Sequence, residues 1–565
     1  MKFSEYKYER INVEVCKEEL AKATEVIKTS CDFDEVINTI NNINKMKKDV
    51  DTSFTLCSIR YSINTTDEFY SKEQDYIDEV GPILMGYQNE YNKALVASPI
   101  VGKLEEHFGK KLFDEIRLSL TTFSNEIIED LQEENKLVSK YSKLIASAKI
   151  DFDGKIVNLS QLGPYFQSLD RETRKNAELA LGGFLDEHES EFDEIYDKLV
   201  HVRDTMAKKL GFENYVKLGY ARLGRTDYDS EMVANYRKQI YEELVPVCNE
   251  IYDRQAKRLG ISKLMNYDLA VDFKSGNPMP KGTTEELVDK ASKMYHEMSK
   301  ETGEFFDFMT SHELMDLDAK AGKSSGGYCT FIANYSSPFI FSNFNGTSGD
   351  IDVLTHEAGH AFQIYTTSKH IDVPEYLWPT MEACEIHSMS MEFFAWPWMD
   401  LFFEEATTKR LYSHMLGTIT FIPYGAAIDE FQHEVYSRPE MTKDERKATW
   451  RRIEKKYCPA RVYTSAELEK GTYWYRQGHV FNTAFYYIDY TLAQVCAQQF
   501  WIKDQENHEK AWEDYYKLCK AGGSKTFLKL LDLANLKNPF IDGTIKFVTD
   551  KLKAWLLSVD EEKIK

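Results

Sequence analysis

The chain has 565 residues, of which 42% are hydrophobic and 13% aromatic; this composition suffices for a large core and excludes a disordered or fibrous protein. The formal net charge of −22 makes nucleic acid an unfavourable partner, because an acidic surface repels phosphate. The nine cysteines are odd in number, scattered and without a CxxC pair, unlike a disulfide framework or a cysteine zinc cluster.

The N-terminal residues 1–12 are polar and charged, and they lack the apolar core of a signal peptide. No stretch approaches the 18 apolar residues of a membrane-spanning helix. We therefore expect a cytoplasmic protein with buried, reduced thiols and no membrane partner. The sequence does not indicate an oligomeric state.

Most of the chain shows helical periodicity. The clearest helix begins at Thr283, which follows a breaker sequence at 277–282 and forms a capping-box pattern with Glu286. Its apolar residues then recur on one helical face as far as residue 300. Further helices are predicted at residues 18–48, 112–148, 231–259 and 511–520.

Strand patterns are few. Residues 149–159 predict a hairpin around Asp153-Gly154, and residues 326–344 predict a second strand region, in which Pro338 indicates an edge strand or a strand start. The predicted fold class is mainly α, a multi-helix protein with a small β-sheet. We place a boundary near residue 190, between an N-terminal helical region (1–190) and a catalytic region (191–565).

An HExxH motif stands at His356-Glu357-Ala358-Gly359-His360. On a helix, residues four apart share a face, so both imidazoles can bind one zinc ion, and Glu357 then lies beside the open position as a general base. Chance alone gives fewer than about 0.05 such motifs in a chain of this composition. The apolar flanks predict a buried helix, in which two histidines and a glutamate need polar partners such as a metal.

A catalytic zinc needs a third protein ligand. Thr366 and Gln363 stand where a metzincin has its third histidine and its glycine, which excludes that class. A glutamate from a later segment is the common alternative, and the candidates are Glu375, in a predicted loop, and Glu382 and Glu385, on a predicted helix at 380–394. On that same helix Glu392 or Glu382 could orient a ligating histidine, whereas His387 is a packed or solvated side chain.

Residues 349–362 resemble the zinc helix of the thimet-oligopeptidase and oligoendopeptidase F family, and residues 338–346 resemble the strand beside its active site. In that family the third ligand follows the second histidine by 25 residues in an E-x-x-S context, which here is Glu385 with Ser388. The resemblance implies Glu385 as the third ligand, one Zn²⁺ per chain and the bacterial oligoendopeptidase F-like branch. It also implies an elongated helical metallopeptidase with an internal channel that admits short peptides.

The same family has a downstream histidine followed by tyrosines that donate to the tetrahedral intermediate. The matching residues are His479, then Tyr490 and Tyr486, with Tyr487 the weakest candidate because the spacing varies between branches. Without the metal motif, tyrosines at helical spacing indicate only an amphipathic core.

The predicted function is hydrolysis of internal peptide bonds in short oligopeptides by a zinc metalloendopeptidase. Zinc activates a water, Glu357 takes and returns its proton, and the peptide pairs with the edge strand expected near residues 339–344. Two alternatives stay open. A zinc carboxypeptidase would need a cation for the terminal carboxylate, such as Arg461 or Arg476, and a non-enzymatic helical binding protein would not need Glu357.

Overall fold

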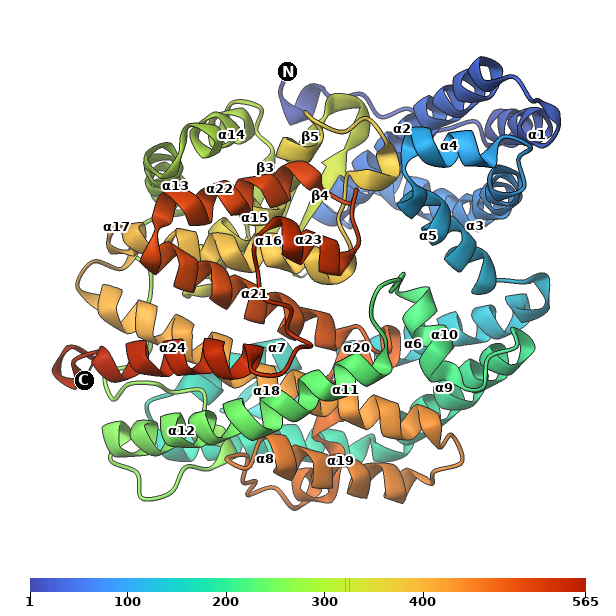
Figure 1. Ribbon diagram of the computed structural model, residues 1–565. Helices are drawn as coiled ribbons and strands as arrows, with labels where there is room; N and C mark the ends of the chain where they lie inside the picture. The colour runs from blue at the N-terminus through green and yellow to red at the C-terminus, as the bar shows by residue number, and fades with distance from the viewer. Residues whose placement is uncertain (321, 325, 565) are drawn as a thin grey trace. The chain divides into compact units, whose positions relative to one another are not determined.

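Figure 1 shows the computed structural model of the protein, which describes residues 1–320, 322–324 and 326–564. The chain is mainly helical, as predicted, and forms two compact units from interleaved segments. Unit 1 comprises Met1–Leu120, Met279–Glu404 and Lys503–Leu536. Unit 2 comprises Thr121–Pro278, Glu405–Ile502 and Lys537–Lys565.

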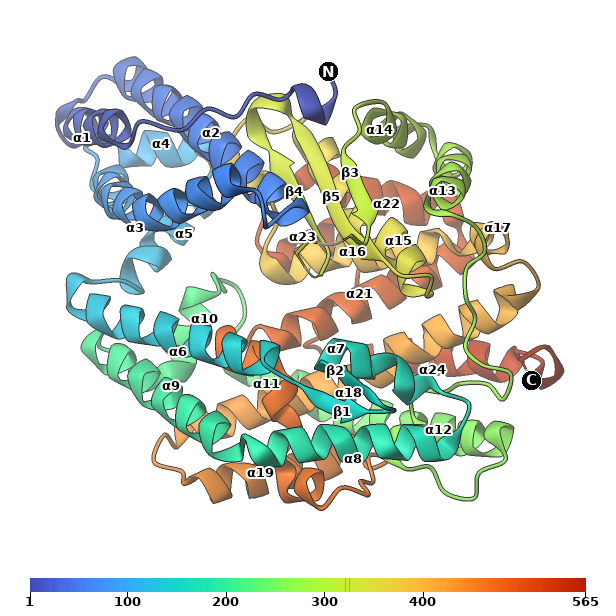
Figure 2. The ribbon, with the colours of Figure 1, turned by 180° about the vertical axis from the view of Figure 1, so that it is seen from behind.

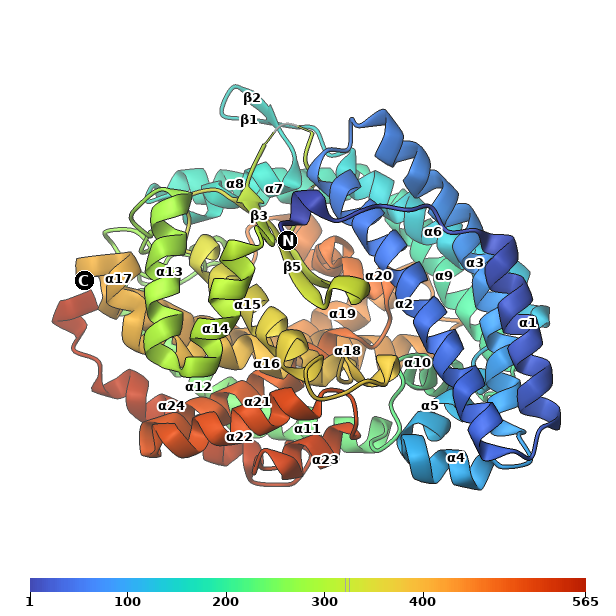
Figure 3. The same ribbon diagram turned by 90° about the horizontal axis from the view of Figure 1, so that it is seen from above.

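The first part of unit 1 is a helical layer, coloured blue in Figures 1 and 3, whose helices bury a shared apolar core. Its helices are α1 (Val13–Thr29), α2 (Phe33–Ile63), α3 (Glu68–Val96), α4 (Val101–Phe108) and α5 (Lys110–Thr121). Asn12, Asp32 and Asp67 cap the first three helices by accepting backbone N–H bonds, which explains where each helix begins. The predicted helix at 18–48 is thus two helices, because α1 ends at Thr29 and Asp32 caps the start of α2.

A three-stranded sheet in unit 1 has the order β3 (Met315–Asp318), β5 (Ser337–Phe344), β4 (Tyr328–Ile332), with β5 parallel to β3 and antiparallel to β4 (Figure 2). The prediction of an edge strand near residues 339–344 is wrong, because β5 is central. Pro338 is tolerated there because β3 pairs with β5 only from Ile340 onward, so the missing N–H of Pro338 leaves no bond of β3 unmade.

The remaining helices of unit 1 pack around this sheet. Helix α15 contacts β5, β4, α16 and α22, and α13 and α14 lie beside it (Figure 3). These helices are α13 (Thr284–Met298), α14 (Lys300–Ser311), α15 (Gly349–Thr367), α16 (Met381–Phe394), α17 (Met399–Phe403), α22 (His508–Ala521) and α23 (Phe527–Leu533). Thr283 caps α13 and forms a capping box with Glu286, as predicted.

In the described part of unit 2, one hairpin, β1 (Ile150–Phe152) and β2 (Lys155–Val157), accompanies the helices and lies beside α7 and α8 (Figure 2). Asp153 and Gly154 form its turn with positive φ values of 53° and 71°, so the predicted hairpin is confirmed. The helices are α6 (Ile128–Ala146), α7 (Leu159–Leu162), α8 (Arg171–Glu187), α9 (Glu189–Lys209), α10 (Tyr215–Arg222), α11 (Ser230–Gln239), α12 (Val245–Leu259), α18 (Thr407–Ser437), α19 (Lys443–Tyr457), α20 (Gly478–Asn482), α21 (Tyr487–Glu506) and α24 (Thr544–Ser558).

The predicted boundary near residue 190 falls within α9, and the compact units divide at other positions. Among residues 1–320, 322–324 and 326–564, no helix has both the length and the apolarity to cross a bilayer.

Candidate active site

Helix α15 carries the HExxH motif, and hydrogen bonds hold the loop that precedes it. The buried carboxylate of Asp350 accepts backbone N–H bonds from Asn345 and Gly346 at 2.9 and 2.8 Å, which closes the loop over the first turn of the helix. The apolar side of α15 is buried against the sheet and against α16 and α22. His356, Glu357 and His360 lie on its half-buried side.

Helix α16 approaches α15 closely at Gly359, the glycine inside the motif. An added Cβ there would lie 2.7 Å from the Cα of Ser388 and 2.8 Å from the carbonyl oxygen of His387. Only glycine permits this approach, and the approach brings Glu385 of α16 to the two histidines.

The three predicted ligands meet in one group. Glu385 Oε2 lies 3.3 Å from Nε2 of His356 and 3.6 Å from Nε2 of His360. Zinc bonds of about 2.0–2.1 Å in a tetrahedral arrangement place ligand atoms about 3.3–3.4 Å apart. The donor set, two imidazoles and one carboxylate, and its spacing therefore fit a zinc ion with a further position for water or substrate.

The other side of His356 contacts a second carboxylate, because its Nδ1 lies 2.6 Å from Glu392 Oε1. Burial by itself would lower the pKa of His356, but Glu385 and Glu392 outweigh it and raise that pKa well above its usual value. Burial likewise opposes ionisation of Glu385, yet His356 and His360 hold its pKa well below the usual range. The two carboxylates that favour a positive charge on His356 would also attract a metal cation. In metal sites, a carboxylate that binds the second ring nitrogen of a histidine commonly orients that histidine towards the metal.

The structure also places the alternative ligands. Glu375 forms an ion pair at 2.8 Å with Lys47 of α2, and Glu382 is buried on α16 one turn before Glu385. Within the described part of the chain, the group of potential ligand atoms that contains both motif histidines includes Glu385 and neither of these residues. The assignment of Glu385 as a ligand stays a prediction, now with a geometry that fits it.

Two neighbours of Glu385 have structural roles. Ser388 donates a hydrogen bond to Glu385 Oε2 at 3.1 Å, so the serine of the E-x-x-S pattern orients the carboxylate. His387 is fully buried and donates from Nδ1 to the carbonyl of Ala383 at 2.8 Å. Burial lowers the pKa of His387 to about 4, so it is a neutral packed side chain, in line with its interpretation from the sequence.

His479 and the predicted tyrosines form a cluster in unit 2. The ring centroid of His479 lies 5.9 Å from that of Tyr486, 5.1 Å from that of Tyr487 and 5.6 Å from that of Tyr490. Tyr486 and Tyr490, one helical turn apart, have centroids 5.0 Å apart. Burial raises the pKa of Tyr487 to about 12.

Residues that the sequence did not single out support this cluster. Tyr424 of α18 donates to Gln477 Oε1 at 3.1 Å, which aims the amide nitrogen of Gln477 at Nδ1 of His479, 2.8 Å away. Nδ1 accepts this bond, so the neutral imidazole carries its proton on Nε2. No local sequence pattern marks Gln477 or Tyr424, because the contact joins two segments 53 residues apart.

A small sheet beside an HExxH helix, with a glutamate supplied by the next long helix, is the arrangement of a metallopeptidase. Residues 3–123 match the peptidase M3 N-terminal domain, and residues 165–548 match peptidase family M3. The chain belongs to peptidase family M3.

Within the family the similarity is to bacterial oligoendopeptidase F proteins, as predicted. An oligoendopeptidase F homolog of Borreliella burgdorferi is 26% identical over 403 residues, a match that covers 69% of this chain and 66% of that relative. The solved structure of Pz peptidase A with an inhibitor has a TM-score of 0.93 and 54% identity, covering 99% of this chain and 100% of the other. A structure from Bacillus anthracis (strain Ames), assigned as an oligoendopeptidase F, has a TM-score of 0.89 and 51% identity, covering 100% and 99%.

Proposed function

We propose that this protein is a zinc-dependent endopeptidase that hydrolyses internal bonds of short oligopeptides. The observation that carries the proposal is the spacing of His356, His360 and Glu385, which matches a tetrahedral zinc site, together with the Glu392 carboxylate behind His356. Membership of peptidase family M3 and the oligoendopeptidase F relatives support the substrate class.

Glu357 is the proposed general base. It follows His356 directly on α15 and, like both motif histidines, lies on the half-buried side of that helix. When bound, zinc supplies Lewis acidity at the position that the three ligands define. Glu357 removes a proton from the attacking water and returns it to the leaving amine.

His479 and the tyrosines are the proposed donors to the developing oxyanion. The Tyr424–Gln477 pair keeps the proton of His479 on Nε2, the tautomer that can donate from that nitrogen. Tyr490 and then Tyr486 supply further O–H donors, and Tyr487 is the least favoured.

The substrate strand is proposed to pair with β4 rather than β5. β5 is hydrogen-bonded on both sides, whereas β4 is at the edge of the described sheet and carries Cys329 near Glu357. An extended peptide added to such an edge is recognised through its main chain, so broad tolerance of side chains follows. The nine free thiols support the proposed cytoplasmic location.

The test is cleavage of a quenched-fluorescent peptide of about ten residues blocked at both ends, long enough to extend beyond both ends of the five-residue β4. The wild type should cut internally and lose activity to a chelator, and Glu357→Gln should keep one zinc per chain while losing nearly all activity. Glu285→Gln, an exposed change on α13, is the matched control and should behave as wild type.

Two results would redirect the assignment. Cleavage only of peptides with a free C-terminus would favour a carboxypeptidase, in which Arg461 or Arg476 would grip the carboxylate. In the structure both guanidiniums contact tyrosines, Arg461 over the Tyr424 ring at 4.3 Å and Arg476 by donating to Tyr473 at 2.8 Å. A Glu357→Gln protein indistinguishable from wild type would favour a non-enzymatic binding protein.

A further inference from the structure

The tyrosine cluster follows a turn with an unusual backbone. Between α20 and α21 the bulky residue Phe485 has φ of 68°, a left-handed conformation that side chains with a Cβ rarely adopt. Such a conformation persists only where the surroundings fix it, and these positions concentrate at functional sites. Phe485 directly precedes Tyr486, so the backbone conformation at this turn sets the direction in which the tyrosine-bearing segment starts.

Three kinds of contact fix Phe485. Its N–H donates to Gln432 Oε1 at 3.1 Å, and its carbonyl accepts a bond from Arg225 Nη2 at 2.6 Å. Its ring is fully buried, with centroids 4.8 Å from the ring of His433 and 5.6 Å from that of Tyr220. Both backbone polar groups and the side chain are therefore held by other segments of unit 2.

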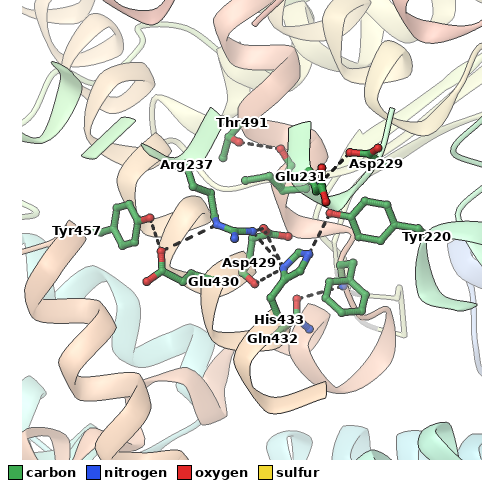
Figure 4. Close-up of polar contacts among 12 residues, drawn as sticks. Tyr220, Asp229, Glu231, Arg237, Asp429, Glu430, Gln432, His433, Tyr457 and Thr491 are labelled. Carbon is green, nitrogen blue, oxygen red and sulfur yellow. Dashed lines mark hydrogen bonds and ion pairs between the residues drawn. The ribbon is translucent and has the colours of Figure 1, made fainter. Parts of the chain in front are cut away.

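The residues against which the Phe485 ring packs belong to a network of hydrogen bonds and ion pairs (Figure 4). His433 Nε2 lies 3.1 Å from the Tyr220 hydroxyl, and His433 Nδ1 lies 3.2 Å from Asp429 Oδ2. Arg237 of α11 donates to the same Asp429 oxygen. The network joins α10, α11 and α18 and leaves the ring little freedom to move.

Arg225 connects this turn to the helix that follows. Its Nη2, which binds the Phe485 carbonyl, also donates to Asp489 Oδ1 at 2.6 Å. The guanidinium stacks over the rings of Tyr220 and Tyr228 at 4.3 and 5.3 Å. Arg225 is 7% exposed and Asp489 is fully buried, so the ion pair is shielded from solvent and from salt screening.

The two groups that Arg225 binds, the Phe485 carbonyl and the Asp489 carboxylate, stand just before and within the first turn of α21. Tyr486 lies between the Phe485 carbonyl and Asp489, and Tyr490 follows Asp489 directly. A group that holds the backbone at 485 and the side chain at 489 fixes the rotation and tilt of this turn. The geometry of Tyr486 and Tyr490 against His479 depends on that rotation.

We propose that Arg225 is a positioning residue for the peptidase reaction, which orients Tyr486 and Tyr490 by binding the Phe485 carbonyl and Asp489 at once. This inference rests on the proposed function, because it acts through the tyrosines as donors to the oxyanion. Arg225 itself touches no substrate.

The first test removes the ion pair without leaving a buried lone charge, in the double variant Arg225→Met/Asp489→Asn. A displaced donor of about 1 Å costs on the order of 100-fold in rate, so we expect kcat to fall by roughly 30–100-fold. KM should change by less than about threefold and zinc content should stay at one per chain, because only transition-state contacts are affected. The matched control is Arg174→Met/Asp268→Asn, which removes another buried ion pair of unit 2, joined at 2.8 Å, and should lower stability and leave kcat unchanged. Arg171, the second partner of Asp268, is partly exposed and can be solvated in this variant.

The second test separates positioning from general destabilisation. Tyr490→Phe is made in the wild type and in the Arg225→Met/Asp489→Asn background. If Arg225 acts through the tyrosines, Tyr490→Phe lowers kcat by about 100-fold in the wild type but by no more than about threefold in the variant background. Independent, multiplying losses would overturn the inference.

The outcomes distinguish this inference from the proposed function. If Tyr490→Phe and His479→Ala both keep wild-type kcat, the proposed donors are wrong and the positioning role falls with them. If these variants lose kcat while Arg225→Met/Asp489→Asn keeps it, only the positioning role is wrong. Should the double variant not fold, Arg225→Lys keeps a positive charge beside Asp489 but lacks the guanidinium that also binds the Phe485 carbonyl; a fall in kcat of about threefold to tenfold at constant KM supports the inference, and unchanged kcat overturns it.

Discussion

Replacing Gly359 with alanine tests whether the close approach of α15 and α16 builds the metal site. The new Cβ would lie 2.7 Å from the Cα of Ser388, whereas carbon atoms in contact lie about 3.5–4.0 Å apart, so α16 must move by about 0.8 Å or more. Overpacking of this kind costs about 1–3 kcal/mol, and the higher helix propensity of alanine returns about 0.5–1 kcal/mol. We expect the free energy of unfolding to fall by about 1–2 kcal/mol.

In Gly359→Ala, the same displacement of α16 moves Glu385 away from His356 and His360 on α15. Glu385 lies one turn from Ser388 on α16, and metal sites tolerate errors of only about 0.2 Å in ligand distance, so zinc affinity should fall by at least about tenfold. Chemical denaturation and titration with a competing chelator measure the two effects. The control is Gly417→Ala on α18, where an added Cβ meets nothing within 4 Å and the change should be neutral or stabilising. Unchanged stability and zinc affinity in Gly359→Ala would refute this account of the helix contact.

Three further predictions concern α16. Glu385→Gln should lose zinc while Glu382→Gln keeps one zinc per chain by elemental analysis; the reverse would make Glu382 the ligand. Glu392→Ala should weaken zinc binding by about 10–100-fold in a chelator competition, because His356 loses the carboxylate behind it, and wild-type affinity would exclude that role. Burial lowers the pKa of His387 to about 4, so its contribution to stability is present above pH 6.5 and is lost as pH falls towards 4, by up to about 3 kcal/mol. His387→Leu should flatten this part of the pH–stability curve, and an unchanged slope would contradict the assignment.

The sequence predicted the elements that local rules determine. The capping box at Thr283 and the Asp153-Gly154 turn depend on residues a few positions apart, and both appear as predicted. The HExxH spacing determines by itself that His356 and His360 share a helical face. These features could be predicted because their causes are close together in the chain.

The order of the strands and the contacts between distant segments could not be predicted from local sequence patterns. Whether β5 is central or at an edge depends on β3 and β4, and nothing within residues 337–344 records those partners. Arg225 and Phe485 are 260 residues apart, and a positive φ at a phenylalanine has no local sequence signature. Supporting residues distant in the chain, such as Arg225, therefore escaped prediction, whereas Glu392 was a candidate because it lies on the same predicted helix as Glu385.

The interleaving of the two units has a consequence during synthesis on the ribosome. Helix α22 belongs to unit 1 with the motif helix: Tyr515 donates to the carbonyl of His387, and Thr367 at the end of α15 donates to the carbonyl of Cys519. The helix pair α15 and α16 thus lacks part of its packing until about residue 520 has left the exit tunnel. We expect nascent chains to stay inactive towards peptides until then, so that a peptidase made among unfolded polypeptides acquires its cutting activity only after α22 has emerged.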